Sequence, residues 1–262
     1  MRLVDTHCHL NLDEFNDDIL DVINQSIKQN VYPILIPGID MKTSLKAIEI
    51  AEHFDHVYAA IGIHPNEAST WDDSTARLIL ELTQHPKVKA IGEIGLDYYW
   101  NKSSPEQQKG TFLAQLELAE GSGLPVIIHS RNSIQEVLSL LSVWFSNQPD
   151  KQKKLGVLHS FEGDLSEANM AESINFFISL AGPVTYKNAK NKHQLACDLS
   201  IENLLLETDS PFLTPVPLRG KRNTPQNIIL IAERIAQLRQ TTLKCIAQET
   251  SKNANKLFAW EY

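Results

Sequence analysis

The chain has 262 residues, of which 42% are hydrophobic and 21% are charged, and its formal net charge is −8. This balance is typical of a globular protein with a sizeable core, and the acidic charge argues against broad, sequence-independent coating of nucleic acid. A nuclease is not excluded, because bound metal ions supply local positive charge. No stretch approaches the roughly 20 apolar residues of a membrane span, and the three cysteines form no CxxC pair. We therefore expect a soluble, cytoplasmic protein without membrane contacts.

Eight short runs rich in Val, Ile and Leu predict β-strands, and amphipathic segments between them predict helices. The predicted strands cover residues 3–7, 32–37, 57–63, 88–94, 125–129, 156–161, 176–181 and 203–208. Helical spacing gives two segments an apolar face: residues 17–29 with Ile19, Leu20, Ile23 and Ile27, and residues 106–121 with Phe112, Leu113, Leu116 and Ala119. After the last strand we expect a long loop over 210–224 and a helical part from about Pro225.

The alternation of eight strands with helices predicts an α/β fold, a single-domain (β/α)8 TIM barrel over residues 1–262. A doubly wound open sheet is the alternative, but the chain has neither a GxGxxG motif nor a Walker loop. In a TIM barrel, functional side chains come from the C-terminal ends of several strands, because these ends meet at one face. The residues at the predicted strand ends are therefore the first place to look for chemistry.

Six side chains that can bind metal stand at the C-terminal ends of five predicted strands: His7, His9, Glu93, His129, His159 and Asp209. Taken singly, a histidine is more often a hydrogen-bonded core residue than a ligand, and a carboxylate is usually a helix cap or a loop charge. Two imidazoles on one strand face, as in the HxH of residues 7–9, need a common partner, because burial without one carries a desolvation penalty. The joint pattern predicts a metal centre, with Cys8 directed to the opposite face.

The size of this set indicates more than one ion. Four histidines and two carboxylates exceed the needs of a single ion that keeps a position open for substrate. Two divalent ions bridged by a carboxylate fit better, and Glu93 is the predicted bridge, with Gly92 and Gly95 leaving room for a close approach. Mixed nitrogen and oxygen ligands suit Zn²⁺, Mn²⁺ or Mg²⁺ and do not select among them.

Eight motifs in order carry a family resemblance: DTHCH, GIHP, GEIGLDYY, PVIIHSR, LHSFEG, SLAGPVTYKNAK, LLLETDSP and RGKRNTP. Together they resemble the TatD family of metal-dependent hydrolases, within the amidohydrolase-like superfamily, over about residues 3–225. The resemblance implies a TIM barrel, a two-metal site and hydrolase activity, mostly as deoxyribonucleases. It also implies that one ion is held by His7, His9 and Asp209 and the other by His129 and His159, with Glu93 shared. One departure is HSF where relatives often have HCF, and Ser160 should face away from the barrel interior.

Catalytic and supporting roles follow as hypotheses. Asp209 is the candidate general base for an attacking water and acts together with Glu93. His64 could orient substrate or be a structural residue before Pro65, and Arg131 could clamp a phosphate or form a surface salt bridge. Asp97 could hold the tautomer of a ligand histidine.

Two more carboxylates, Asp5 and Glu207, are expected to be buried. They share strand parity with His9 and Asp209 and should therefore point into the barrel. They could support a metal ligand or belong to a buried polar network.

Local positive charge and aromatic residues bear on the substrate. Basic residues gather in two loops after the last two strands, where TIM barrels often bind phosphate: Lys187, Lys190 and Lys192, and Arg219, Lys221 and Arg222. Arg219 and Arg222 are therefore candidate substrate contacts, although such loops can also be merely solvated. Residues 98–100 could stack on bases or pack the loop after the fourth strand.

We expect a deoxyribonuclease that trims single-stranded DNA as a 3′–5′ exonuclease. The alternative is a small-molecule amidohydrolase, a lactonase or amidase, with the same two-metal barrel. Many enzymes of that superfamily use a carboxylated lysine as the bridge, whereas this chain has Glu93 and no strand-end lysine. A non-catalytic metal-binding protein is the least favoured reading, because the ligand set includes a candidate base.

Overall fold

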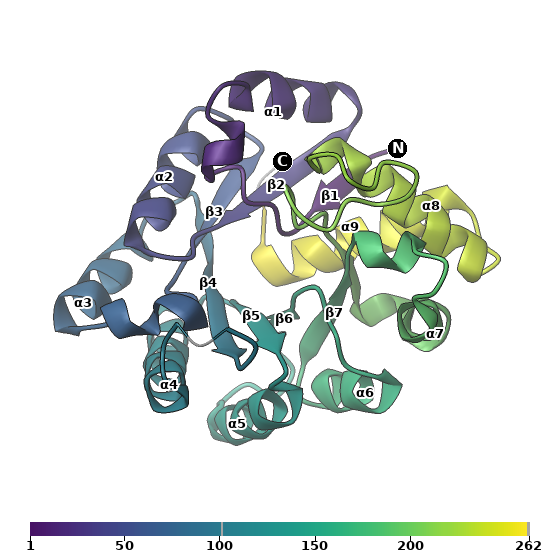
Figure 1. Cartoon of the computed structure of the whole chain (residues 1–262). Coiled ribbons are helices and arrows are strands. Elements are labelled where there is room, and N and C mark those ends of the chain that lie inside the picture. The colour runs from purple at the N-terminus through teal and green to yellow at the C-terminus, as the bar shows by residue number, and fades with distance from the viewer. Residues whose placement is uncertain (101, 261–262) are drawn as a thin grey trace.

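The structure is a computed structural model that describes residues 1–100 and 102–260. Eight parallel strands follow one another in sequential order around a barrel (Figure 1). They are β1 (Leu3–Asp5), β2 (Val31–Pro37), β3 (Val57–Ile61), β4 (Val88–Asp97), β5 (Val126–Arg131), β6 (Gly156–Leu158), β7 (Phe176–Leu180) and β8 (Leu204–Leu206). Thr6 links the first strand to the last, because its amide and its hydroxyl donate to the carbonyl oxygen of Leu206 at 3.2 and 2.9 Å. The predicted (β/α)8 TIM barrel is confirmed.

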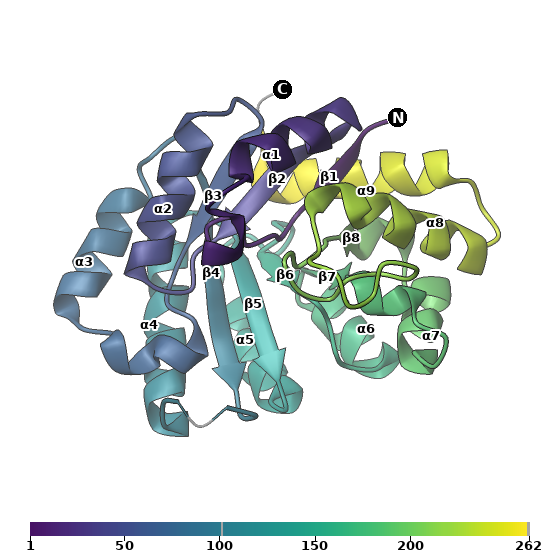
Figure 2. The ribbon, with the colours of Figure 1, turned by 45° about the horizontal axis from the view of Figure 1, so that its top comes forward.

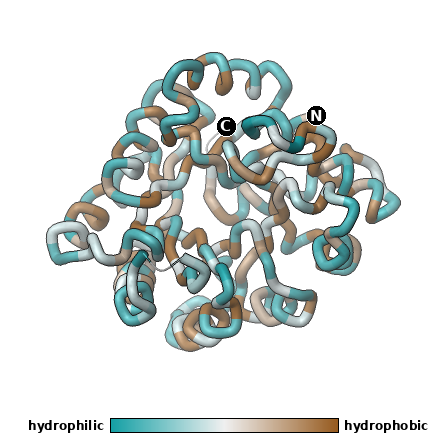
Figure 3. The backbone as a smooth tube through the Cα atoms, viewed as in Figure 1, coloured by the Kyte–Doolittle hydropathy of each residue, from teal (hydrophilic) through white to brown (hydrophobic). Residues whose placement is uncertain are grey.

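Helices alternate with the strands and surround them on the outside, as two views show (Figures 1 and 2). They are α1 (Ile19–Lys28), α2 (Met41–Glu52), α3 (Asp73–Leu82), α4 (Pro105–Ser122), α5 (Ile134–Asn147), α6 (Leu165–Ser173), α7 (Lys190–Asp198), α8 (Ile228–Leu238) and α9 (Leu243–Phe258). Hydrophilic and hydrophobic stretches alternate along the outer helices, as expected for helices with one buried face (Figure 3). None of the described helices is long and apolar enough to cross a membrane.

Local sequence signals explain where the helices begin. At α4, the hydroxyl of Ser104 accepts from the amide of Gln107, whose side chain accepts in return from the amide of Ser104. Pro105 occupies the first helical position, where its missing N–H has no partner to lose. Reciprocal caps of the same kind open α2 and α6.

Two residues of the predicted apolar faces are in fact exposed, Leu20 to 60% and Leu113 to 39%. Consecutive helical residues lie about 100° apart, so the core takes in only one of two neighbouring apolar residues. In α4 the buried member is Phe112, followed by Leu116 and Ala119 on the same face.

The predicted strand boundaries were wrong at several C-terminal ends. β1 stops two residues early. Beyond it, the amide of Cys8 still donates to Leu35 of β2, whereas the amides of Thr6 and His9 donate to Leu206 of β8 and to Ser210 in the loop after β8. β4 instead runs three residues further than predicted, since Asp97 still pairs with Arg131 of β5. These ends are where the candidate functional residues lie.

The opposite end of the barrel is closed by the C-terminal segment. Leu257, Phe258 and Trp260 cluster with side chains from all eight strands, among them Tyr58 and Leu205. In Figure 1, α9 crosses behind the strands and covers this end. The helix thus serves as a floor for the barrel, which leaves the C-terminal ends of the strands for the functional site.

Candidate metal centre

His7 and His9 follow β1 and direct their Nε2 atoms to one place. The two nitrogens are 3.1 Å apart, and both side chains are buried. Cys8 lies between them and is directed away, with its Sγ 3.8 Å from the carbonyl oxygen of Leu35, within the apolar core. The structure therefore agrees with the predicted strand parity, and Cys8 takes no part in the cluster.

Asp209 reaches this pair because the loops after β1 and β8 are hydrogen-bonded to each other. The amide of Asp209 donates to the carbonyl of His7 at 2.9 Å, and the amide of His9 donates to the carbonyl of Ser210 at 2.7 Å. Asp209 has a positive φ of 53°, which aspartate tolerates better than most residues. Its Oδ1 lies 3.7 Å from Nε2 of His7 and 3.5 Å from Nε2 of His9.

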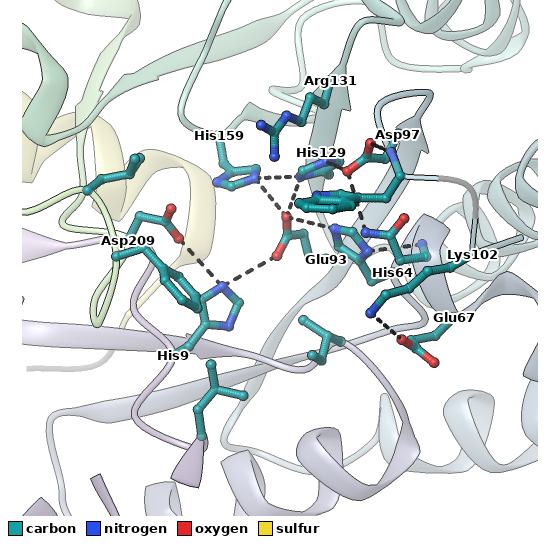
Figure 4. A pocket seen from close by; sticks show the side chains of 16 residues that line it. His9, His64, Glu67, Glu93, Asp97, Lys102, His129, Arg131, His159 and Asp209 are labelled. Atoms are coloured by element: carbon teal, nitrogen blue, oxygen red, sulfur yellow. Dashed lines mark hydrogen bonds and ion pairs between the residues drawn. The ribbon is translucent and has the colours of Figure 1, made fainter. Parts of the chain in front are cut away.

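Glu93 stands between two pairs of histidines and turns one carboxylate oxygen to each. Figure 4 shows it between His9 of the first pair and His129 and His159 of the second. Its Oε2 is 3.5 Å from Nε2 of both His7 and His9. Its Oε1 is 2.8 Å from Nδ1 of His129 and 2.7 Å from Nε2 of His159. The geometry is that of a carboxylate able to bridge two cations.

Two glycines of β4 allow this arrangement. A Cβ on Gly92 would stand 2.6 Å from Cβ of Ile127, and one on Gly95 would stand 2.0 Å from the carbonyl oxygen of His129. Gly95 also has a φ of +141°, which residues with a side chain rarely adopt. The close approach of β4 and β5 places Glu93 beside His129.

The distances between donor atoms fit bound metal ions. Bonds of 2.0–2.1 Å in a tetrahedral site separate neighbouring donors by about 3.4 Å, and octahedral bonds of that length by about 3.0 Å. The separations run from 3.1 to 3.7 Å on the side of Glu93 facing His7, His9 and Asp209. On the side facing His129 and His159 they run from 2.7 to 3.2 Å. Each side could therefore hold a cation.

Two further carboxylates lie behind the ligand candidates, and one of them, Asp97, is hydrogen-bonded to a ligand candidate. Asp97 Oδ2 lies 3.1 Å from Nε2 of His129, which leaves Nδ1 of that ring to face Glu93. Burial raises the pKa of Asp97, but its hydrogen bond to His129 outweighs this and brings the pKa to about 2. Glu207 Oε1 lies 3.6 Å from Nδ1 of His159 and accepts the amide of Ser160 at 2.5 Å. A supporting role for Asp97 and Glu207 stays a prediction.

The charges in the centre depend on one another. Burial raises the pKa of Glu93, but the imidazoles of His159 and His64 outweigh burial and hold it well below its ordinary value. Burial lowers the pKa of His159, but the charge of Glu93 raises it well above its ordinary value. Burial and the adjacent His159 ring, stacked at 4.1 Å, lower the pKa of His7. A buried negative charge of this kind requires positive charge beside it, from a protonated imidazole or a metal cation.

Asp5 belongs to a buried network that reaches the backbone of the centre, since its Oδ1 accepts the amide of His7 at 3.3 Å. Its carboxylate accepts the amide of Thr208 at 2.9 Å and contacts the Thr208 hydroxyl at 2.5 Å. Burial raises the pKa of Asp5 to about 8. Of the two roles considered for this residue, the polar network is the one present, and it ties the end of β1 to the chain after β8.

Five of the six metal-ligand candidates, all except His7, line a cavity of about 500 Å³, and His64 lines it as well. His64 Nε2 lies 3.6 Å from Oε1 of Glu93, and burial together with the charge of His129 lowers its pKa to about 3. Its Nδ1 accepts the amide of Asn66 at 3.1 Å, at the start of a short 3-10 helix, Pro65–Thr70. His64 is therefore a neutral cap of this turn and also faces the cavity with its Nε2.

Arg131 also lines the cavity, with its guanidinium 3.8 Å above the ring centroid of Tyr99. Among the residues that the structure describes, no carboxylate forms an ion pair with it, so the surface salt bridge considered above is not found. Tyr98 donates to Glu136 at 2.8 Å and packs the loop, whereas Trp100 lines the cavity. Packing of the loop is therefore the role seen for Tyr98, and base stacking stays a prediction for Trp100.

Three basic residues that follow β7 and β8 do not line the cavity, and substrate contact by Arg219 and Arg222 stays a prediction. Arg222 forms an ion pair with Asp18 at 2.5 Å, and its guanidinium lies 4.6 Å from the ring centroid of Phe15. Arg219 lies 4.3 Å from the ring centroid of Tyr186 and does not line the cavity. Lys192 is half-buried and donates to the carbonyl of Phe161.

Among the described residues, seven others that line the cavity were not singled out by the sequence analysis: Leu12, Ile39, Asn66, Glu67, Lys102, Phe212 and Leu213. Phe212 follows the ETDSP motif closely in the chain, which is the signal that could have revealed it.

Comparisons with known proteins show which family the chain resembles. A family model described as TatD related DNase matches residues 4–259. The metal-dependent hydrolase YabD of Bacillus subtilis is 41% identical, and the 3′-5′ ssDNA/RNA exonuclease TatD of Escherichia fergusonii is 33% identical, each with 98% of both chains covered. Among solved structures, the TatD homologue YJJV of Escherichia coli K12 superposes with a TM-score of 0.91 at 28% identity, again over 98% of both chains.

Proposed function

Because this chain belongs to the TatD family of metal-dependent hydrolases, which act on ester bonds, we propose that its substrate is DNA, shortened from a single-stranded 3′ end. One observation carries the proposal: Glu93 offers one oxygen to each of two donor groups at the base of an open cavity. Centres of this kind suit displacement at phosphorus. The exonuclease named among the relatives supports the choice of nucleic acid and of polarity.

The proposed centre has two divalent cations, Mg²⁺, Mn²⁺ or Zn²⁺. The first would be held by His7, His9 and Asp209, the second by His129 and His159, and Glu93 would be shared between them. When bound, such ions polarise a phosphoryl oxygen and lower the pKa of a coordinated water.

Asp209 is the proposed general base. Burial raises its pKa, but the hydrogen bond from His9 and the nearby His7 bring that pKa below its ordinary value. Its carboxylate is therefore ionised at neutral pH and lines the cavity, where it can accept the proton of an attacking water.

His64 and Arg131 are proposed to position the substrate. Because Nδ1 of His64 accepts a backbone amide and the ring is neutral, its proton is on Nε2, which faces the cavity and can donate to a phosphate oxygen. Arg131 can donate two parallel hydrogen bonds to a phosphate, and its packing on Tyr99 limits the freedom lost on binding.

The test uses a 5′-labelled single-stranded oligonucleotide and its duplex with each of the three metals. We expect a ladder of shortened labelled products from the single strand, and loss of at least 100-fold in rate in Asp209→Asn. The exposed carboxylate variant Asp150→Asn is the matched control and should match the wild type. Intact nucleic acid with every metal, together with cleavage of lactones or amides, would establish the small-molecule amidohydrolase instead. Release of the label as a mononucleotide would reverse the proposed polarity.

A further inference from the structure

Exposed aromatic rings gather at one place on the molecule. Among the residues that the structure describes, three large aromatic side chains are clearly exposed: Tyr99 (52%), Trp100 (49%) and Phe212 (48%). The first two follow β4 and the third follows β8, so all three stand at the C-terminal end of the barrel. Trp100 and Phe212 line the cavity above the metal-ligand candidates. Flat apolar faces left in water beside a polar centre indicate a ligand that has flat faces of its own.

Asp97 fixes the position of the turn that carries Trp100 relative to the metal-ligand candidates. While Oδ2 of Asp97 contacts His129, its Oδ1 accepts the backbone amides of Tyr99 and Trp100 at 2.9 and 3.2 Å. The aromatic turn therefore keeps a fixed position relative to His129.

Phe212 lies beside His9, which is in the other group of metal-ligand candidates. The ring of Phe212 lies 6.2 Å from that of His9, in an edge-on arrangement. Figure 4 shows His9 and Asp97 on opposite sides of Glu93. The rings of Phe212 and Trp100 therefore flank the position that a scissile phosphate would take.

Tyr99 has a different role from its two aromatic neighbours. Its face is occupied by the guanidinium of Arg131 at 3.8 Å, whereas the distance from Arg131 to the Trp100 ring is 5.8 Å. Trp100 meets Tyr99 edge to face. Tyr99 thus holds a phosphate-binding cation in place, and the indole of Trp100 keeps its capacity to stack.

We propose that Trp100 and Phe212 are stacking surfaces for two nucleobases, one on each side of the scissile phosphate. The inference rests on the proposed phosphodiester hydrolysis and adds how the substrate is selected. A base can lie against an aromatic side chain only when it is not paired in a duplex, so this pair of rings selects single-stranded ends. The bases contribute by their flat faces, and the selection is therefore tolerant of sequence.

The test compares two oligonucleotides, one with normal bases at its last two positions and one with abasic residues there. The measured quantity is the ratio of kcat/KM for the base-bearing to the abasic substrate. We expect Trp100→Ala and Phe212→Ala each to lower this ratio about 10-fold, and Trp100→Phe to stay within threefold of the wild type. Val143→Ala, an exposed apolar residue on α5, is the control and should keep the wild-type ratio.

The outcomes separate this inference from the proposed function. If both alanine variants have the same ratio of kcat/KM as the wild type, the proposal that these rings stack on bases is wrong. The proposed hydrolysis of DNA is not affected by that result. If the wild type cleaves no DNA with any metal, the proposed function falls, and binding decides the inference. Fluorescence anisotropy in the Asp209→Asn background then measures the binding preference for base-bearing over abasic DNA. We expect Trp100→Ala to abolish this preference. If the variant keeps the preference, the proposed stacking is wrong.

Discussion

Asp97 is the residue on which two parts of the site depend. One carboxylate oxygen contacts Nε2 of His129 and the other accepts two amides of the aromatic turn. It thereby sets both the tautomer of a ligand candidate and the position of Trp100. A group of this kind binds neither metal nor substrate itself, yet its loss should affect both.

Asp97→Asn should weaken metal binding 10- to 100-fold, because the amide no longer holds the Nε2 proton of His129 with a full charge. Isothermal titration with Mn²⁺ measures this directly. Glu207→Gln is the matched comparison and should have a smaller effect, since Glu207 is 3.6 Å from His159 and not within hydrogen-bonding distance. Equal affinities in wild type and Asp97→Asn would contradict the assigned role.

Lys192 gives a pH dependence of stability. Burial lowers its pKa in the folded protein from 10.5 to about 8. Between these two values the unfolded chain binds more protons, so this group makes the free energy of unfolding rise with pH, by about 3 kcal/mol in all. Below pH 8 both states are protonated and its contribution is constant.

Lys192→Met should remove this rise. Urea denaturation at pH 7.5, 8.5 and 9.5 measures it as the difference between variant and wild type, so that other titrating groups cancel. Lys190→Met, at an exposed position of the same helix, is the control. Parallel stability curves for wild type and Lys192→Met would show that the buried ammonium is not responsible.

Among the elements, β4 decides the geometry of the centre. It is the longest strand described, and its glycines bring its backbone against β5. This contact places Glu93 from one strand beside His129 from the next. The bridge position therefore depends on the absence of side chains at neighbouring positions as much as on the glutamate itself.

Gly95→Ala should destabilise the protein by 2 kcal/mol or more and reduce metal affinity, because its Cβ would meet the carbonyl of His129 and its φ is unfavourable for alanine. Thermal denaturation and metal titration measure the two effects. Gly110→Ala is the contrasting control, since a Cβ there meets nothing within 4 Å in the interior of α4. It should stabilise by about 0.5–1 kcal/mol. A stable, metal-binding Gly95→Ala protein would refute the argument.

At the scale of the whole molecule, the barrel separates stability from function. The strand ends toward α9 are filled by an apolar cluster, which includes Phe258 at 1% exposure and Trp260 at 5%. The opposite ends carry the buried charges and the cavity. Because different residues form the two ends, a substitution at one end should have only a small effect on the other.

Phe258→Ala should lower the free energy of unfolding by about 3–5 kcal/mol through the cavity it leaves, while metal affinity at temperatures where the protein is folded stays within twofold. Removal of metal by a chelator should lower the Tm, and addition of metal should restore it. The reason is that a cation bound only by the folded state stabilises that state. Calorimetry with and without EDTA, alongside metal titration, measures both. A large loss of metal affinity in Phe258→Ala would show that the ends are coupled.

The sequence by itself determined the order of the elements and the six candidate ligands. Strand periodicity is a local property of the sequence, and in a parallel barrel the C-terminal ends of all strands lie at one face. The proximity of His7 and Asp209, which are far apart in the chain, could therefore be predicted from the sequence. The parity of Cys8 and the position of Asp97 followed from the same local rule.

Only the tertiary structure decided which charged and aromatic side chains face the cavity. Arg131 and Arg222 are equivalent as residue types, but one lies on Tyr99 beside the centre and the other is paired with Asp18, the residue before α1. Loop conformation and long-range partners determine such contacts, and neither is encoded in periodicity. Backbone direction is set locally by residue pattern, whereas the place of a flexible charged side chain is set by whichever partner the fold brings within reach.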